Sequence, residues 1–551
     1  MIGVICSQAE EAIVREFFEL FKTPWEFYRG SQSYDVIIST GELVPADQAS
    51  LVIIYGAEKK QLDLENGFSF QSKRNLQLEY SGFFFPVYGP ILTFGSEGNP
   101  LIKVKDSDET VGIIIDGLIG KIFRIGFNIF EEVCLILSSG QPAEFSQVPT
   151  IEIHIDMLRQ WIVGAGILLI EVPPTPPSHE FFVCLTHDVD FAGIRRHKLD
   201  HTMWGFLYRA LFRSFLNALR GRMSWGNLKR NWKAVFLLPA VHLGLTEDFW
   251  LQFDQYAEIE KSHNSTFFLI PFRNRAGKNI FGEVKRRRAV KYDVFDLTEQ
   301  IESLILKGFE IGVHGIDAWH DSERGRQELE RISLVTGKSD MGIRMHWLYF
   351  NENSPKILEE AGFTYDSTIG YNGAIGYRAG TGQVYRPPGA KELLELPLHI
   401  QDTALFYSDR MGLSEKQALA QCERLIENAV YFGGVLVINW HERSFAPERL
   451  WKEPYEKLLN SLHGHRVWFG SGEEVVRWFS RRRRISFDEV SLTRNTLLLK
   501  IGGCEKDVRP PYSIRIHNLA VENFHSKRNM GHSQRYYDIQ LPVGGKVELS
   551  I

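Results

Sequence analysis

The sequence predicts an α/β protein whose central part is a barrel of parallel strands. Between residues 181 and 484, short apolar runs alternate with helical patterns, which indicates parallel strands covered by helices. Their number fits a (β/α)7-type barrel, slightly short of eight strands. The runs are FFVCLTHD, NSTFFLI, GFEIGVH, MGIRM, LLELPLHI, GVLVINWH and HRVWFG.

The segments on either side of the barrel have different patterns. Residues 1–170 combine the strand-like runs IGVIC, DVIIST and LVIIYG with long helical patterns, one of them at 118–137, and predict an N-terminal α/β domain. Four prolines within residues 171–180 predict a stiff linker. Residues 485–551 are short apolar runs joined by turn residues, so we expect a small C-terminal β-sandwich.

Composition narrows the class of protein. A net charge of -5 with 44% hydrophobic residues is ordinary for a globular protein and predicts no polyanionic partner for the whole chain. The cysteines are odd in number and lack CxxC spacing, which favours reduced thiols. The N-terminus has no basic leader, and the apolar run 161–170 is shorter than the roughly 20 residues that span a bilayer. We expect a cytoplasmic protein, with the inner face of the membrane as the alternative location. The cysteines are Cys6, Cys134, Cys184, Cys422 and Cys504.

Polar residues gather where the predicted barrel strands end. Asp188 and Asp190 close the first run and share one face of the strand because they are two residues apart. Two neighbouring carboxylates are costly unless a cation or a shared proton relieves their repulsion. His314, Arg344 and His441 follow three other runs. Each alone is more often a cap or a surface residue, but together they predict a site at the carboxyl ends of the strands.

The motifs THDVD, VHGIDAWH, GIRMHW, YDST and INWH, in this order, resemble those of the polysaccharide deacetylases of carbohydrate esterase family 4. This resemblance implies a distorted (β/α) barrel that holds one divalent metal, usually Zn²⁺, on one aspartate and two histidines. It also implies the roles of the matching residues. Asp188 matches the catalytic base, Asp190 the metal-binding aspartate, His314 the first metal-binding histidine, Arg344 the arginine that orients the base, and His441 the proton donor to the leaving group.

One position departs from the family pattern. The second metal-binding histidine of the family lies four residues after the first, and Ala318 stands there in this chain. His320, on an extended loop, is the preferred replacement. Asp317, which shares a helical face with His314, is the alternative. Loss of a protein ligand, with weaker metal binding, is a third possibility.

Further residues are expected to contact the substrate. His346, Trp347 and Trp440 lie next to the motifs and predict walls of a sugar pocket; for the tryptophans, packing in the core is the alternative interpretation. Asp402 follows a strand-like run and is expected to orient a catalytic group.

The helical insert, residues 195–245, leaves the barrel directly after Asp190. Its first part, 195–233, contains ten Lys or Arg, seven aromatic residues and a single acid, Asp200. Apolar positions 204, 208, 211, 215 and 219 have helical spacing, which predicts an interfacial helix attracted to anionic lipid. A hairpin packed on the barrel with a solvated basic face is the alternative. The run KRRR at 285–288 extends the basic charge, and no nucleic-acid recognition motif is present.

The resulting functional hypothesis is a metal-dependent carbohydrate N-deacetylase of bacterial surface-polysaccharide or exopolysaccharide biosynthesis. Its substrate is expected to be an N-acetylated sugar or glycan precursor, with a lipid-linked form as one option. Two alternatives stay open: a hydrolase of another C–N bond, and a glycan-binding protein that has lost activity.

Overall fold

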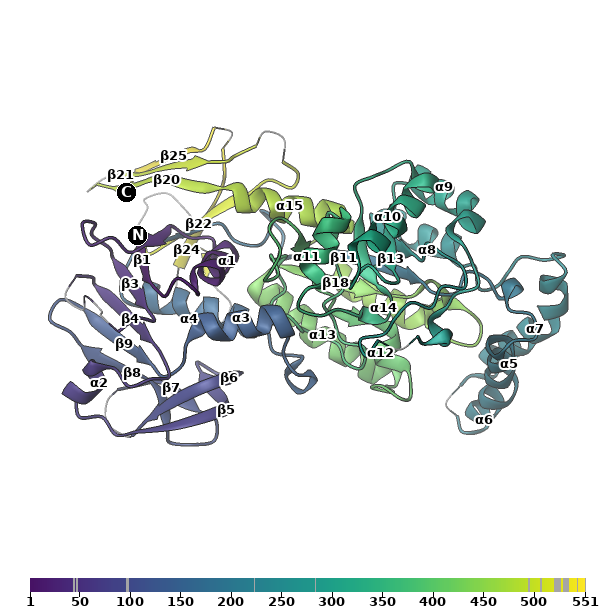
Figure 1. The fold of residues 1–551 in the computed structure, drawn as a ribbon, viewed down its shortest axis with the longest axis horizontal. Coiled ribbons are helices and arrows are strands. Elements are labelled where there is room, and N and C mark those ends of the chain that lie inside the picture. The colour runs from purple at the N-terminus through teal and green to yellow at the C-terminus, as the bar shows by residue number, and fades with distance from the viewer. Residues whose placement is uncertain are drawn as a thin grey trace.

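The computed structural model describes residues 1–42, 45, 48–95, 99–221, 223–282, 284–493, 496–505, 508–519, 527–528, 535–542 and 544–550. The N-terminal domain and the barrel lie side by side, and the C-terminal strands lie over the N-terminal domain (Figure 1). Among the described residues, no helix is both long and apolar enough to cross a membrane.

The N-terminal domain is built on one mixed sheet of order β2-β1-β3-β4-β9-β8-β6-β5-β7. The first five strands pair in parallel and the others antiparallel. The strands are β1 (Ile2–Ile5), β2 (Trp25–Phe27), β3 (Val36–Ser39), β4 (Leu51–Tyr55), β5 (Phe70–Tyr80), β6 (Phe83–Phe94), β7 (Asn99–Val104), β8 (Thr110–Asp116) and β9 (Lys121–Ile125). The helices are α1 (Glu11–Phe21), α2 (Gln61–Glu65), α3 (Ile129–Ser139) and α4 (Thr150–Gly164).

The helical pattern predicted at 118–137 is wrong over its first half. This stretch forms the inner strand β9, which pairs with β4 and β8, and only then the helix α3. Asn128 separates the two, because its side chain accepts the backbone N–H groups of Phe130 and Glu131 and so caps α3. Apolar residues at similar density in both elements concealed this change of period.

The barrel is an open, all-parallel half-barrel of order β16-β15-β14-β13-β12-β11-β18-β17, with β19 also paired to β11. Its strands are β11 (Phe181–Val189), β12 (Ser265–Leu269), β13 (Glu310–Gly315), β14 (Gly342–Met345), β15 (Tyr365–Asp366), β16 (Leu394–Glu395), β17 (Ile400–Gln401), β18 (Val435–Asn439) and β19 (Val467–Phe469). Its helices are α8 (Phe253–Ile259), α9 (Thr298–Leu306), α10 (Ser322–Thr336), α11 (Ser354–Ala361), α12 (Asp402–Phe406), α13 (Glu415–Phe432), α14 (Lys452–His463) and α15 (Gly472–Arg484).

Each of the seven predicted runs contains strand residues, but the strand count differs from seven. The run LLELPLHI holds two short strands, β16 and β17, on either side of Pro397, which has no N–H to donate to a ladder. The two-residue strand β15 has too little pattern to be predicted. The helical insert forms α5 (His201–Tyr208), a π-helical turn (Arg209–Arg213), α6 (Ser214–Leu219) and α7 (Trp225–His242).

The C-terminal strands form two small sheets. One contains β20 (Ser486–Leu492), β21 (Thr496–Gly502) and β25 (Lys546–Ser550). The other has the order β10-β22-β24-β23, with β22 (Ser513–His517), β23 (Lys527–Arg528) and β24 (Arg535–Gln540) joined by β10 (Leu169–Glu171). Since β10 precedes the linker, β22, β24 and β23 complete a sheet that begins in the N-terminal part of the chain.

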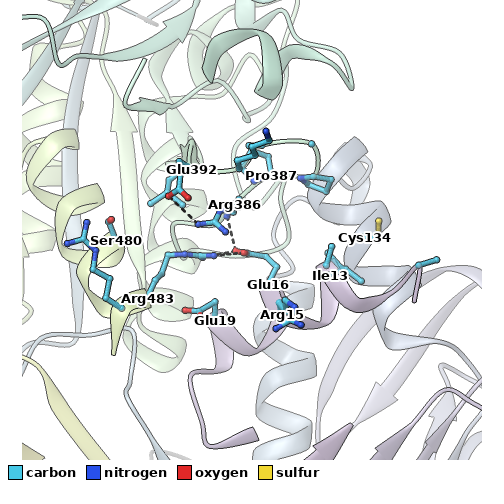
Figure 2. A pocket seen from close by; sticks show the side chains of 18 of the residues that line it. Ile13, Arg15, Glu16, Glu19, Cys134, Arg386, Pro387, Glu392, Ser480 and Arg483 are labelled. Atoms are coloured by element: carbon cyan, nitrogen blue, oxygen red, sulfur yellow. Dashed lines mark hydrogen bonds and ion pairs between the residues drawn. The ribbon is translucent and has the colours of Figure 1, made fainter. Parts of the chain in front are cut away.

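The arginine run at the end of α15 joins the domains. The buried Arg482 donates to the carbonyl oxygens of Glu19, Leu20 and Val172. Arg483 pairs with the Glu16 carboxylate on α1, which also accepts the backbone N–H of Arg386 (Figure 2). A cavity of about 760 Å³ lies at this junction. The run therefore has a structural role in joining the barrel to the N-terminal domain.

Acid is expected to weaken the N-terminal domain through His154 on α4. Burial between the Phe85 and Phe127 rings lowers its pKa from 6.5 to about 3, and neither ring nitrogen has a described hydrogen-bond partner. The unfolded chain then binds a proton that the native state does not, so this stability is present above pH 6.5 and is lost as the pH falls towards 3. Between pH 7 and pH 5 the loss is about 2 kcal/mol, at about 1.4 kcal/mol per pH unit.

Urea unfolding at both pH values measures this loss. His154→Phe is expected to lose about 2 kcal/mol less than the wild type, whereas the exposed His201→Phe should behave like the wild type. Equal acid losses in the wild type and His154→Phe would contradict the assignment.

Candidate metal centre and catalytic residues

The site lies at the carboxyl ends of four barrel strands. Asp188 is the penultimate residue of β11, and Asp190 directly follows this strand. His314 is the penultimate residue of β13, His346 directly follows β14, and His441 comes two residues after β18. β11, β12, β13 and β14 are successive neighbours, and β18 pairs with the other side of β11. Parallel pairing brings their ends to one edge, where loops can be polar without disturbing the core.

Asp190, His314 and His346 form a cluster with the ligand set of a metal site. One ligand atom from each lies within 4.8 Å of the others. Asp190 Oδ1 is 3.3 Å from His314 Nε2 and 3.4 Å from His346 Nε2. This oxygen is buried and has no hydrogen-bond partner among the described residues. His314 Nδ1 donates to the Arg344 carbonyl at 2.8 Å, a bond that leaves the Nε2 lone pair facing the cluster.

Protonation states also suit a cation. Burial opposes ionisation of Asp190, but the imidazoles of His346, His314 and His441 outweigh it and hold the pKa of Asp190 well below its ordinary value. Burial lowers the pKa of His346 far below 6.5, against the opposing effect of Asp190. An ionised carboxylate with neutral imidazoles is the state in which these groups bind metal, so an orphaned oxygen facing two imidazole nitrogens fits a divalent ion.

The third member of the cluster differs from the one expected. His346, expected from the sequence in the wall of the sugar pocket, lies beside Asp190, whereas His320 and Asp317 are outside the cluster. His320 Nε2 instead lies 3.2 Å from Asp317 Oδ1, and Asp317 Oδ2 accepts a bond from Arg324. Asp317 also accepts the backbone N–H of Lys278 in the connection between β12 and α9, so both of its oxygens already have partners outside the cluster.

Asp188 is held from both sides by buried donors. Its Oδ1 accepts from Arg344 Nη1 at 3.0 Å, and its Oδ2 accepts from Asn439 Nδ2 at 2.8 Å. Burial raises the pKa of Asp188, but the Arg344 charge outweighs this effect and lowers it below the ordinary value. Arg344 is itself fixed by Thr186 and Ser367. Asp188 is therefore an ionised carboxylate with a fixed orientation.

Asn439 was not among the predicted site residues. It stands two residues before His441 in the motif INWH, on β18, opposite Thr186 of β11. Its amide bonds both the backbone N–H and the carboxylate of Asp188. A polar residue that ends an otherwise apolar strand next to a candidate site residue was the available signal.

His441 forms a pair with the buried Asp402. Nδ1 of His441 lies 2.6 Å from Asp402 Oδ1, and the His441 backbone N–H donates to Oδ2 at 2.8 Å. Ser444 also hydrogen-bonds Oδ2. Burial lowers the pKa of His441, but the Asp402 charge and hydrogen bond outweigh burial and raise it above 6.5. Nε2 faces the cluster, 3.7 Å from Asp190 Oδ2, so His441 can carry a proton to the site.

The two tryptophans differ in their surroundings. Trp440 is buried, donates from Nε1 to the Trp451 carbonyl, and packs against Phe406 and Tyr455. The expectation of a sugar contact is therefore wrong for Trp440, which belongs to the core. Trp347 is half-buried, has φ = 68°, and its ring lies 5.8 Å from that of His346, so it stays a candidate for the pocket wall.

Arg288, the last residue of the KRRR run, is part of the structure around the candidate site and does not add to the positive charge of the surface. Arg288 is buried, donates to the carbonyl of His346 at 2.9 Å, and lies over the Tyr349 ring. It also bonds the Lys278 carbonyl at 3.0 Å. Arg288 thus fixes the turn that carries His346, a role that a run of like charges did not indicate.

Fold and site together define a parallel α/β half-barrel with an Asp/His/His cluster, a buried carboxylate and an Asp-held histidine at its carboxyl end. The sequence matches no protein-family model and no curated protein. Its structural neighbours are carbohydrate esterase family 4 polysaccharide deacetylases and an allantoinase, over slightly more than half of the chain and at low identity.

Three solved structures illustrate this likeness. A putative polysaccharide deacetylase from Mycobacterium smegmatis is 19% identical and aligns over 59% of this chain and 99% of its own, with a TM-score of 0.36. Puue allantoinase is 14% identical over 56% of this chain and 92% of its own, with a TM-score of 0.34. A probable polysaccharide deacetylase from Pseudomonas aeruginosa PAO1 is 16% identical over 56% and 93%, with a TM-score of 0.34. Because these values are low, the chemistry of this chain is inferred from its own site residues.

Proposed function

We propose that this protein is a metal-dependent deacetylase that hydrolyses the N-acetyl group of an amino sugar in bacterial surface-polysaccharide or exopolysaccharide biosynthesis. The observation that carries the proposal is the placement of an ionised carboxylate, Asp188, and an Asp-held imidazole, His441, beside the Asp190, His314 and His346 cluster. The sugar substrate follows from the motif resemblance, with a lipid-linked precursor as one form.

Asp190, His314 and His346 would hold the metal, and their oxygen and nitrogen donors suit Zn²⁺. Such an ion, when bound, makes water a stronger acid and polarises the amide carbonyl. The protein's contribution is to orient the two imidazoles. The Arg344 carbonyl does so for His314, and the Arg288 guanidinium holds the His346 backbone.

The remaining residues divide the proton transfers between them. Asp188 accepts the proton of the water that attacks the amide carbon, while Arg344 and Asn439 keep its carboxylate in one orientation. His441 donates its Nε2 proton to the sugar nitrogen as the C–N bond breaks. Asp402 holds the ring through Nδ1 and favours the protonated form. The products are acetate and the free amino sugar.

The test is acetate release by the purified full chain loaded with Zn²⁺. N-acetylglucosamine oligomers are the substrate, and hydantoin serves as a cyclic amide from the alternative class. Acetate release that scales with bound metal and is absent in Asp188→Asn supports the proposal. Hydantoin opening without acetate release would identify a hydrolase of another C–N bond. Sugar binding with metal bound, but no acetate above the Asp188→Asn level, would identify a glycan-binding protein.

A further inference from the structure

The helical insert presents two apolar faces. One faces inward, where Met203, Phe206 and Ala210 pack with Ala234 and Leu238 of α7. The other faces solvent and carries the larger residues, with Trp204, Tyr208 and Phe212 exposed by 57%, 61% and 64%. These three are spaced four residues apart and continue through Leu216 and Leu219, while α7 adds Trp225, Trp232 and Phe236. A surface helix normally turns its large aromatic residues towards the core. Because these are exposed to solvent, the outer face has the composition of a surface that binds another apolar surface.

The charge on the insert is of one sign. Residues 201–246 contain no Asp or Glu and seven Lys or Arg, a charge of +7 in a chain whose net charge is -5. Arg213, Arg220, Lys229, Arg230 and Lys233 are exposed, and none has an ion pair with a described carboxylate. Exposed cations without counter-charges, interleaved with aromatic residues on helices, match a surface that carries negative charge above an apolar layer.

The insert is anchored at its base and projects at its tip. At the base, Asp248 accepts the backbone N–H groups of Ile194 and Arg195, and Arg443 of the barrel stacks 3.4 Å over the Trp250 ring. Beyond this point α5, α6 and α7 extend away from the barrel (Figure 1). A cavity of about 780 Å³ lies between α7 and the barrel, and Arg230, Lys233 and Leu237 line it on the α7 side. The exposed aromatic residues of α5 and the π-helical turn do not line this cavity, so the outer apolar face is not a packing surface for the barrel.

A second exposed segment has the same chemistry. Ile280, Phe281 and Val284 are exposed, and the cations of 285–287 follow them. This segment connects β12 to α9, while the helical insert follows β11, and the two strands are parallel neighbours. Both connections therefore leave the barrel at the end that carries the candidate metal centre.

We propose that the helical insert is a docking surface for an anionic lipid bilayer. Trp204, Tyr208 and Phe212 enter the boundary between headgroups and acyl chains. The cations outside the cavity beside α7, Arg213, Arg220 and Lys229, contact lipid phosphates. Residues 280–281 and 284–287 add a second contact. Docking in this way places the mouth of the candidate site next to the membrane surface. The proposal depends on no metal and on no enzymatic activity, so its test is separate from that of the proposed function.

Vesicle sedimentation of the full chain tests the proposal, with vesicles of phosphatidylcholine alone and with 30% phosphatidylglycerol. The wild type is expected to bind the anionic vesicles more tightly and to lose binding as salt rises. Arg213→Gln, Arg220→Gln and Lys229→Gln combined should weaken binding on the order of 100-fold, about fivefold for each charge. Trp204→Ser, Tyr208→Ser and Phe212→Ser combined should weaken it at least tenfold.

Matched controls remove equal amounts of charge or apolar surface elsewhere. Lys338→Gln, Lys356→Gln and Lys416→Gln combined form the charge control, and Leu118→Ser, Leu306→Ser and Leu334→Ser the apolar control. Both should bind like the wild type. Quenching of tryptophan fluorescence by lipids brominated on their acyl chains tests insertion in the unmodified protein.

Three results would overturn the proposal. The first is a wild type that does not bind anionic vesicles at low salt and whose tryptophan fluorescence is not quenched by the brominated lipids. The second is an equal loss of binding in the control variants. The third is a wild-type dimer, seen by light scattering, that the Trp204, Tyr208 and Phe212 substitutions convert to a monomer without vesicle binding in either form, because the face would then be covered by a second copy of the chain.

Discussion

His346→Ala is expected to weaken metal binding by about 100-fold or more, whereas His320→Ala should leave it unchanged. His346 Nε2 lies 3.4 Å from the orphaned Asp190 Oδ1, while His320 Nε2 is bonded to Asp317. Zinc bound by four protein ligands gains about 10–16 kcal/mol, or roughly 3 kcal/mol for each ligand, so loss of one is a large effect. Elemental mass spectrometry after dialysis against a weak chelator, with a competitive zinc titration, measures both variants.

The comparison also separates metal loss from unfolding. Both substitutions remove an imidazole from a loop at the same end of the barrel, so thermal unfolding of the metal-free proteins shows whether either fold is damaged. Asp190→Ala is the positive control for metal loss. Retained metal in His346→Ala together with lost metal in His320→Ala would restore the ligand predicted from the sequence and exclude the cluster described here.

The location of the site followed from the sequence, because it depends on strand order alone. Asp188, Asp190, His314 and His441 each follow an apolar run, and parallel strands bring such positions to one edge. No register or side-chain packing was needed for this inference. The same reasoning predicted the parallel sheet but not the division of LLELPLHI into β16 and β17, which depends on a single proline.

The choice of the third ligand could not be made from spacing. The sequence favours Asp317 or His320 as the third metal ligand because both lie close to His314 along the chain, and only such short separations limit the distance between two side chains. The third member is instead His346, which directly follows the neighbouring strand β14. The pairing of His314 with Arg344 between β13 and β14 brings the two imidazoles together. Arg288 and Asn439 escaped prediction for the same reason, since their partners are distant in sequence.

Asp188→Asn and His441→Gln are each expected to lower the rate of acetate release by about 10²–10⁴-fold while leaving bound metal near the wild-type level. Neither residue belongs to the Asp190, His314 and His346 cluster, so the ion should remain. Asp188→Asn also leaves Arg344 bonded to Thr186 and Ser367, which limits the loss of stability. Initial rates, metal content and unfolding midpoints are measured on the same preparations, with the exposed Asp340→Asn and His463→Gln as matched controls.

Asp402→Asn distinguishes positioning from direct proton transfer. The Asp402 carboxylate touches His441 Nδ1 and lies behind the ring, so its loss should lower kcat by less than the loss of His441, with KM nearly unchanged. Combining Asp402→Asn with His441→Gln should cost little more than His441→Gln alone, because Asp402 acts only through the imidazole. Fully additive losses of rate would show that Asp402 contributes independently of His441. Unchanged rates in Asp188→Asn and His441→Gln would show that neither residue transfers a proton, and catalysis would then depend on the metal cluster.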